Sequence, residues 1–243
     1  MTTHSVVDSA SALSSVLNSL QRLPITPPSL YIDVEGIYLS RHGSISILQL
    51  FVLPMSHAYL IDVHTLGKDT FCTAAADGTT TLKTILESGA IPKVFFDVRA
   101  DSDALYGLFG IDLKGVQDIQ LMELGSRGSN KRLVHGLAKC IEQDAVMSIS
   151  ERQSFKAFKE AGTRLFDPQK GGSYEVFNER PLKDELVKYC VQDVVCMPAL
   201  WLLYSRRLST TWAEKVEVET VKRIRLSQSP SFKKGPHMAL GPW

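Results

Sequence analysis

The sequence predicts an α/β domain in which a mixed β-sheet is flanked by helices. Three apolar segments, residues 31–35, 44–53 and 58–63, are rich in β-branched and aromatic residues and are joined by short turns. A helical segment at 82–87 and another strand at 93–96 follow, which gives the order β-β-β-α-β-α. With 243 residues, 44% of them hydrophobic, the chain is long enough to bury one core.

The elements before and after this core divide the chain into three expected parts. Apolar residues at helical spacing in residues 13–20 predict an amphipathic helix, so residues 1–27 are expected to form an N-terminal helical brace. Residues 28–208 are expected to form the main domain, and residues 209–243 a basic helix and tail. Between 125 and 180 the periodicity is weak, and turn residues predict loops.

Two pairs of polar side chains are each directed by one element. Because side chains alternate along a strand, Asp33 and Glu35 point to one face of the sheet and Val34 points to the opposite layer. Tyr189 and Asp193 lie on a segment with helical periodicity, where positions four apart stack on one face. Both pairs are therefore aimed by regular secondary structure.

A third acidic position follows the strand at 93–96, where three aspartates compete. If a helix begins after this strand, Asp101, Leu105 and Leu108 fall on one stripe that faces the core. Asp103 would then point away, and Asp97 remains the alternative to Asp101. The geometry favours Asp101.

Several carboxylates brought together predict a site for divalent cations. Mg²⁺ and Mn²⁺ prefer oxygen ligands, and two such ions about 3.5–4 Å apart can activate a water and hold a scissile phosphate. A tyrosine hydroxyl nearby can orient that water. The candidate catalytic residues are Asp33, Glu35, Asp101, Tyr189 and Asp193, and the four carboxylates among them are the candidate metal ligands.

The chain resembles the ribonuclease D group of DEDD 3′-5′ exonucleases, in the tyrosine-containing (DEDDy) branch, and more narrowly its Egalitarian-related fungal members. The resemblance covers residues 28–208. Each motif is weak alone, and their order makes the set specific. The motifs lie at residues 31–36 (YIDVEG), 43–50 (GSISILQL), 93–105 (KVFFDVRADSDAL), 116–124 (VQDIQLMEL) and 180–200.

The resemblance implies a ribonuclease H-like fold and a role for each motif residue. Asp33, Glu35, Asp101 and Asp193 match the family's metal ligands, and Tyr189 matches the residue that positions the attacking water. The implied activity is hydrolysis of single-stranded nucleic acid from a free 3′ end to nucleoside 5′-monophosphates, with two Mg²⁺ or Mn²⁺ ions and with RNA favoured over DNA. The alternative is an RNA-binding adaptor of the same fold without turnover. The complete residue set favours the enzyme.

Charge is unevenly distributed along the chain. The net charge is +1, yet residues 206–243 contain eight Lys and Arg residues and three Glu residues. This basic segment, with Lys222, Arg223 and Arg225, is expected either to grip a phosphate backbone or to form a solvated helical face. Arg180 is expected to cap a helix, pair with Glu185 or contact a phosphate.

The remaining features of the sequence limit the class of protein to which the chain can belong. The sequence has no run of eighteen apolar residues and no secretory signature at its start, so we expect an intracellular protein, cytoplasmic or nuclear, that does not bind membranes. The four cysteines are expected to be buried thiols, and the six histidines show no metal-ligand spacing. Asp118 is expected to cap a helix or to hold the metal ligands in position without binding the metal itself.

Overall fold

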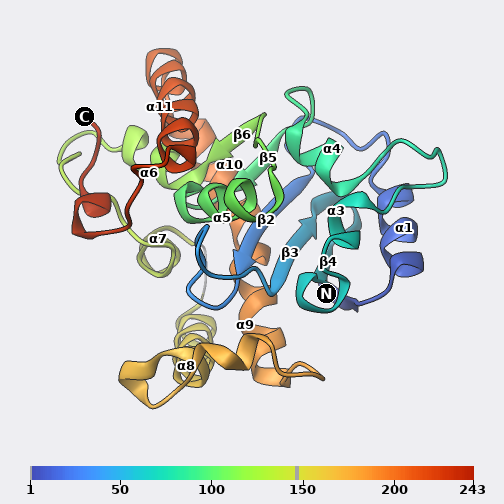
Figure 1. The fold of residues 1–243 in the computed structure, drawn as a ribbon. Coiled ribbons are helices and arrows are strands. Elements are labelled where there is room, and N and C mark those ends of the chain that lie inside the picture. Colours follow the sequence, from blue (N-terminus) through green and yellow to red (C-terminus); the bar gives the residue numbers. More distant parts are fainter. Residues whose placement is uncertain (1, 146–147) are drawn as a thin grey trace.

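The computed structural model describes residues 2–145 and 148–243 and contains a mixed six-stranded sheet with helices on both faces (Figure 1). The strand order is β1-β4-β3-β2-β5-β6. The strands β2, β3 and β4 are antiparallel neighbours, whereas β1, β5 and β6 join in parallel. The fold class expected from the sequence is therefore confirmed. The strands are β1 (Thr3–Val7), β2 (Leu30–Glu35), β3 (Ile47–Val52), β4 (His57–Asp62), β5 (Lys93–Phe95) and β6 (Val116–Asp118).

The helices lie between and after these strands. They are α1 (Ala10–Ser19), α2 (Val63–Leu66), α3 (Asp69–Cys72), α4 (Leu82–Glu87), α5 (Arg99–Phe109), α6 (Ile119–Ser126), α7 (Leu137–Asp144), α8 (Ile149–Phe166), α9 (Asp184–Val195), α10 (Met197–Arg207) and α11 (Thr210–Gln228). Short 3-10 turns occur at Leu53–Met55, Pro168–Lys170, Tyr174–Phe177 and Pro236–Ala239.

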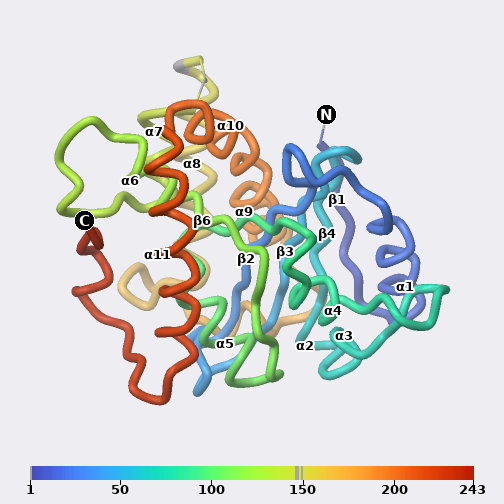
Figure 2. Tube along the Cα trace, turned by 90° about the horizontal axis from the view of Figure 1, so that it is seen from above, coloured from blue at the N-terminus to red at the C-terminus, as the bar shows by residue number. Residues whose placement is uncertain are grey.

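The sheet separates two hydrophobic layers because β2 alternates its side chains between them. Ile32 and Val34 pack with residues of α1, α4 and α5 in one layer. Tyr31 packs in the other layer with residues of α6, α7 and α10. Residues of α9 pack against Ile47 and Leu60 on that same face. Figure 2 shows α1, α3 and α4 on one side of the central strands and α9 and α10 on the other. Asp33 and Glu35 consequently point toward the α9 layer.

Most expected elements form close to their predicted places, and the differences have physical causes. The helix α4 spans the predicted residues, and the second strand begins three residues late, at Ile47. Several elements were not predicted, among them β1 and α8. The edge strand β1 is short and mostly polar, and among residues 150–166 of α8 only Gly162 is buried, so neither element has a strong apolar pattern. A capping box formed by Ser148 and Glu151 marks the start of α8 and is its clearest signal in the sequence.

Two local predictions were wrong. Leu108 is 36% exposed, so the stripe that faces the core ends at Leu105. The sequence also predicts that Arg180 and Pro181 open the helix that carries Tyr189, with Pro181 in its first turn, but α9 begins only at Asp184.

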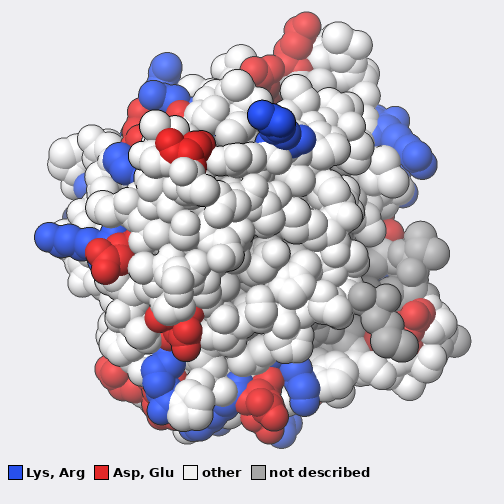
Figure 3. All heavy atoms as spheres, turned by 90° about the vertical axis from the view of Figure 1, so that its right-hand side faces the viewer, with Lys and Arg blue, Asp and Glu red and all other residues white. Residues whose placement is uncertain are grey.

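The C-terminal segment folds back along the body. The helix α11 packs against α5 and α6. Beyond it, Leu240 forms a bridge with Leu133, and the Trp243 ring meets the Trp212 ring at 5.1 Å between centroids. The opposite face of the molecule, on the side of α1, has a largely uncharged centre, with most Lys, Arg, Asp and Glu near its edge (Figure 3).

The stretch Asp184–Arg207 is long and apolar enough to cross a membrane by length and composition alone. It consists of two helices, α9 and α10, that meet at Cys196. Its apolar side chains Leu186, Cys190 and Leu200 are buried within the fold. A core helix of a soluble protein passes the same test.

Candidate active site

Three of the predicted carboxylates meet above the sheet. Asp33 and Glu35 come from β2, and Asp193 comes from the last part of α9. Each offers a carboxylate oxygen within 4.8 Å of the others. Val34, between the first two, is buried in the opposite layer as the strand alternation predicted. The structure therefore brings together residues that lie about 160 positions apart in the sequence.

The position of α9 depends on its apolar face. Leu186, Val187 and Cys190 pack on Ile47 and Leu60 of the sheet, which holds the helix across β3 and β4. The polar positions Tyr189 and Asp193 are then one helical turn apart, next to the carboxylates of β2.

Asp101 lies in the first turn of α5 and is only 5% exposed. Its Oδ1 atom is buried and has no hydrogen-bond partner among the described residues. The Asp101 charge is close enough to raise the pKa of Asp33. Asp101 is therefore a buried carboxyl group next to the three others, with an oxygen that is available to a ligand.

The two competing aspartates are already paired. Arg99 binds Asp97 through two hydrogen bonds of 2.5 and 2.7 Å. Asp103 is buried as well, and it pairs with Arg41 at 2.5 Å, away from the carboxylate group. The geometry thus supports Asp101 as the third acidic position, and its role as a ligand stays a prediction.

Burial and mutual repulsion make the carboxylates unusually weak acids. Desolvation, followed by the charges of Asp101 and Glu35, raises the pKa of Asp33 well above its ordinary value. Desolvation and the charge of Asp193 raise the pKa of Glu35 to about 8. Desolvation also raises the pKa of Asp101 to about 7. Such shifts show negative charge that the protein alone does not neutralise.

Two lysines partly offset this charge. The charge of Lys234, in the C-terminal segment, opposes the rise in the pKa of Glu35 and of Asp101. The Lys159 ammonium group, on α8, forms an ion pair with Asp193 and lies 4.1 Å from the centroid of the Tyr189 ring. Desolvation still raises the pKa of Asp193, and Lys159 opposes the rise. Sequence reasoning missed Lys159, because it lies in the weakly patterned region between 125 and 180.

The helix α8 approaches Tyr189 closely through a glycine. A Cβ atom at Gly162 would lie 2.5 Å from Cδ2 of the Tyr189 ring, so a larger residue would force the two helices apart. Phe166 meets the same ring edge-on at 5.1 Å between centroids. The tyrosine ring is therefore fixed by packing, which is what a residue that orients a water molecule requires.

Asp118 holds the segment that leads into α5. Its side chain caps α6 by accepting a hydrogen bond from the Gln120 amide, as expected for a capping residue. It also accepts one from the Asp97 amide at 3.0 Å and pairs with Arg223 at 2.8 Å. These contacts fix the start of the helix that carries Asp101.

Two basic residues have partners other than those expected. Arg180 binds Asp62 through two contacts of 2.5 Å, so the expected ion pair with Glu185 is wrong. Arg223 is 4% exposed and pairs with Asp118, so it is part of the core and not of a surface that binds phosphates.

The cysteines are free thiols, and Cys72 is exposed, contrary to the expectation that all four are buried.

A second group of metal-binding residue types is explained by pairing within the protein. Glu123, His135 and Cys140 lie within 4.8 Å of one another, an arrangement that the histidine spacing did not predict. Both oxygens of Glu123 are bonded to Arg127, so this carboxylate is already neutralised.

The fold and the unneutralised carboxylates define an α/β domain with an oxygen-rich site suited to divalent cations. A family model described as 3′-5′ exonuclease matches residues 5–202. The chain therefore belongs to the 3′-5′ exonuclease family.

One curated relative is the piRNA biogenesis protein EXD1 of Xenopus laevis. It is 29% identical over 174 residues, which cover 70% of this chain and 35% of that protein. The chain thus spans little more than a third of the length of this relative.

Solved structures of low sequence identity share the fold. RNase D of Trypanosoma brucei in complex with RNA U12 matches with a TM-score of 0.71 and 22% identity over 97% of this chain and 74% of its own. Escherichia coli RNase D matches with a TM-score of 0.66 and 17% identity over 93% and 51%. NrnC of Brucella melitensis with bound Mg²⁺ matches with a TM-score of 0.59 and 19% identity over 96% and 98%.

Proposed function

We propose that this protein is a DEDDy-type exonuclease that uses two divalent cations to remove nucleoside 5′-monophosphates from the 3′ end of single-stranded nucleic acid. Membership of the 3′-5′ exonuclease family gives the reaction class. The observation that carries the proposal is the convergence of Asp33, Glu35 and Asp193 within 4.8 Å, with Asp101 close by.

These residues fit Mg²⁺ or Mn²⁺. All four candidate ligands are carboxylates, which hard divalent cations prefer. The unpartnered Oδ1 of Asp101 and the raised pKa values are the signs of a site that lacks its counter-charge. Asp33, Glu35, Asp101 and Asp193 would hold the ions.

The protein's own groups supply positioning. Bound ions of this kind activate a water and stabilise the leaving oxygen. The Tyr189 hydroxyl group is beside the carboxylates, and burial together with the charge of Asp193 raises its pKa well above the ordinary value. Tyr189 therefore stays protonated and acts as a hydrogen-bonding group that orients the attacking water, not as a base.

RNA is the proposed substrate in preference to DNA. The support comes from the family resemblance and from the RNase D structure that contains RNA U12. Discrimination requires contacts to the 2′-hydroxyl groups of the strand.

The activity is tested with RNA and DNA oligonucleotides labelled at the 5′ end. Each is incubated with the purified protein and Mg²⁺ or Mn²⁺, and in parallel with excess chelator. We expect a ladder of products shortened from the 3′ end, release of nucleoside 5′-monophosphates, and no reaction with chelator. A substrate with a 3′-phosphate and a circular substrate should resist.

Three outcomes would contradict the proposal. Cuts within a circular strand would indicate an endonuclease, and full activity in chelator would exclude the metal mechanism. Tight binding of RNA without any turnover would favour the adaptor function.

A further inference from the structure

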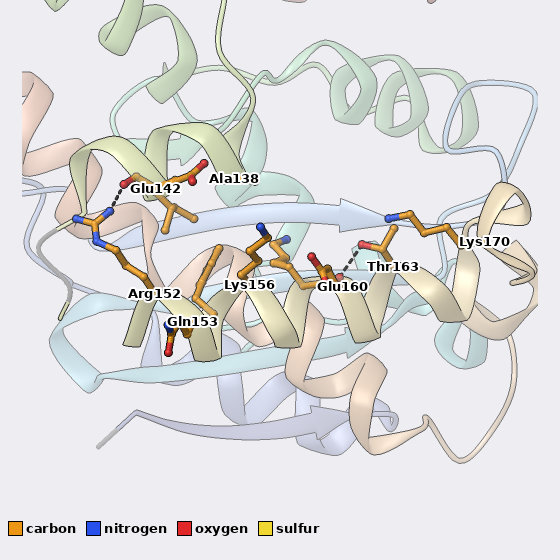
Figure 4. Close-up of a pocket in the computed structure, with 11 residues that line it drawn as sticks. Ala138, Glu142, Arg152, Gln153, Lys156, Glu160, Thr163 and Lys170 are labelled. Atoms are coloured by element: carbon orange, nitrogen blue, oxygen red, sulfur yellow. Dashed lines mark hydrogen bonds between the residues drawn. The ribbon is translucent and has the colours of Figure 1, made fainter. Parts of the chain in front are cut away.

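A groove of about 430 Å³ lies between α7 and α8. Figure 4 shows Ala138 and Glu142 of α7 on one wall and Arg152, Gln153, Lys156 and Thr163 of α8 on the other, with Lys170 at one end. The strand β2 passes behind the groove in this view.

The groove adjoins the candidate active site through a single side chain. Lys159 lines the groove, and the same ammonium group pairs with Asp193 and lies over the Tyr189 ring. A strand in the groove would therefore have its end at the carboxylates.

Two cations of the groove are available to a ligand. Lys156 and Lys170 are exposed, and within residues 2–145 and 148–243 neither ammonium group has an ion-pair or hydrogen-bond partner. Arg152 differs, because its guanidinium group donates to the backbone carbonyls of Glu142 and Ala145. The acidic groups Glu142 and Glu160 also line the groove, so it is mixed in charge with an excess of positive side chains.

The wall also contains apolar surface. Phe155 and Ile141 line the groove, and Phe155 is only partly buried against the core. Single-stranded nucleic acids bind where cations follow the backbone and an aromatic ring meets the bases. An apolar peptide would not need the lysines, so charge complementarity favours a nucleic acid strand.

We propose that the groove between α7 and α8 binds the nucleotides next to the 3′ end of the substrate strand, with Lys156 and Lys170 on the phosphates and Phe155 against a base. This inference deepens the proposed function and rests on it for the position of the 3′ end. It assigns binding of the substrate's phosphate backbone to the groove beside α8 and not to α11, where Arg223 is buried in an ion pair.

The first test measures binding in excess chelator, where no hydrolysis is expected. A 5′-labelled single-stranded RNA with a free 3′ end is titrated at several salt concentrations by fluorescence anisotropy. The groove variant carries Lys156→Glu and Lys170→Glu. The matched control carries Lys222→Glu and Arg225→Glu on the exposed face of α11.

The groove variant should bind more weakly, and its plot of log K against log salt should be shallower by about 1.4, since each phosphate contact on a single strand contributes about 0.7. The control should keep the slope of the unmodified protein. Equal slopes for the groove variant and the unmodified protein, or a loss confined to the α11 control, would overturn the proposal.

The second test locates the strand by photocrosslinking. RNAs with 4-thiouridine at the second, third or fourth position from the 3′ end are irradiated with the protein in chelator. Crosslinks should map to peptides of residues 137–144 and 149–166, and crosslinks in residues 210–243 would overturn the proposal. Groove crosslinks without metal-dependent turnover would uphold the groove and contradict the exonuclease function, whereas turnover with crosslinks on α11 would do the reverse.

Discussion

Two groups of buried or partly buried carboxylates, whose members Asp97 and Asp101 are four residues apart, differ in how their charge is compensated. In the paired group, Asp97 and Asp118 are matched by Arg99 and Arg223 and by backbone amides. In the second group, which we call unpaired because its negative charge exceeds the positive charge beside it, Lys159 pairs with Asp193 and Lys234 lies near Glu35 and Asp101. The pKa values of these carboxylates are nevertheless raised. The unpaired group consists of Asp33, Glu35, Asp101 and Asp193.

This difference separates a structural role from a functional one. A buried charge that is fully paired stabilises one arrangement of the chain. Removing one partner leaves the other charge buried without compensation, which lowers the free energy of unfolding. Buried charges that repel one another reduce stability and persist where something else binds them. The paired group therefore fixes where α5 begins, and the unpaired group is the site that we assign to divalent cations.

The largest expected effect separates Asp101 from Asp97. Asp101→Asn should reduce turnover by about a thousandfold or more, because losing roughly 4 kcal/mol of charge stabilisation in the transition state has that effect. Asp33→Asn and Asp193→Asn should behave alike, with circular dichroism unchanged. Asp97→Asn should keep most of the activity. An inactive Asp97→Asn beside a near-normal Asp101→Asn would reverse our assignment.

The paired group is tested through stability. Arg223→Met removes one partner of a buried pair and should lower the free energy of unfolding by about 3–5 kcal/mol. Urea denaturation measures this loss. Arg225→Met, on the exposed side of the same helix, serves as the control and should change stability by less than about 0.5 kcal/mol. If both variants unfold alike, the pair with Asp118 is not structural.

A smaller effect is expected at Tyr189, which tests positioning next to the unpaired group. Tyr189→Phe retains the ring and its contacts with Gly162 and Phe166. Turnover should fall by about 10- to 1,000-fold from the loss of the orienting hydroxyl group, while Mn²⁺ affinity stays within a factor of two or so. An unaltered rate would leave Tyr189 as a packing residue.

The smallest effect concerns pH and the metal-free protein. Burial raises the folded-state pKa of Glu35 to about 8, above its unfolded value, so its favourable contribution is complete at low pH and is lost as pH rises toward 8. In chelator, Glu35→Gln should therefore raise the melting temperature at pH 8 relative to the unmodified protein. At pH 5 the two proteins should differ far less. Thermal melts at both pH values measure this, and an equal difference at both would mean that Glu35 is not desolvated. A gain of about 1 kcal/mol corresponds to about 2–4 °C for a chain of this size.

The central strands and the carboxylates were predictable because they follow local periodicity. Alternation along β2 put Asp33 and Glu35 on one face, and helical spacing put Tyr189 and Asp193 on another. Both rules need only neighbouring residues. Helical spacing together with the order of the motifs then favoured Asp101 over Asp97.

The partners of these residues were not predictable in the same way. Lys159 reaches Asp193 from a helix whose polar sequence gives little apolar signal. Arg223 looks in the sequence like part of a basic surface, and only the fold reveals Asp118 beside it, 105 positions away. Sequence patterns report the face on which a side chain lies, whereas tertiary packing decides whether a charge is matched.

The central claim is that the unpaired carboxylates, and not the paired ones, bind the divalent cations. Electron paramagnetic resonance of Mn²⁺ titrated into the metal-free protein tests it most directly. We predict that the unmodified protein and Asp97→Asn each bind two ions, and that Asp193→Asn loses at least one. Binding that is abolished by Asp97→Asn and unaffected by Asp193→Asn would contradict the account.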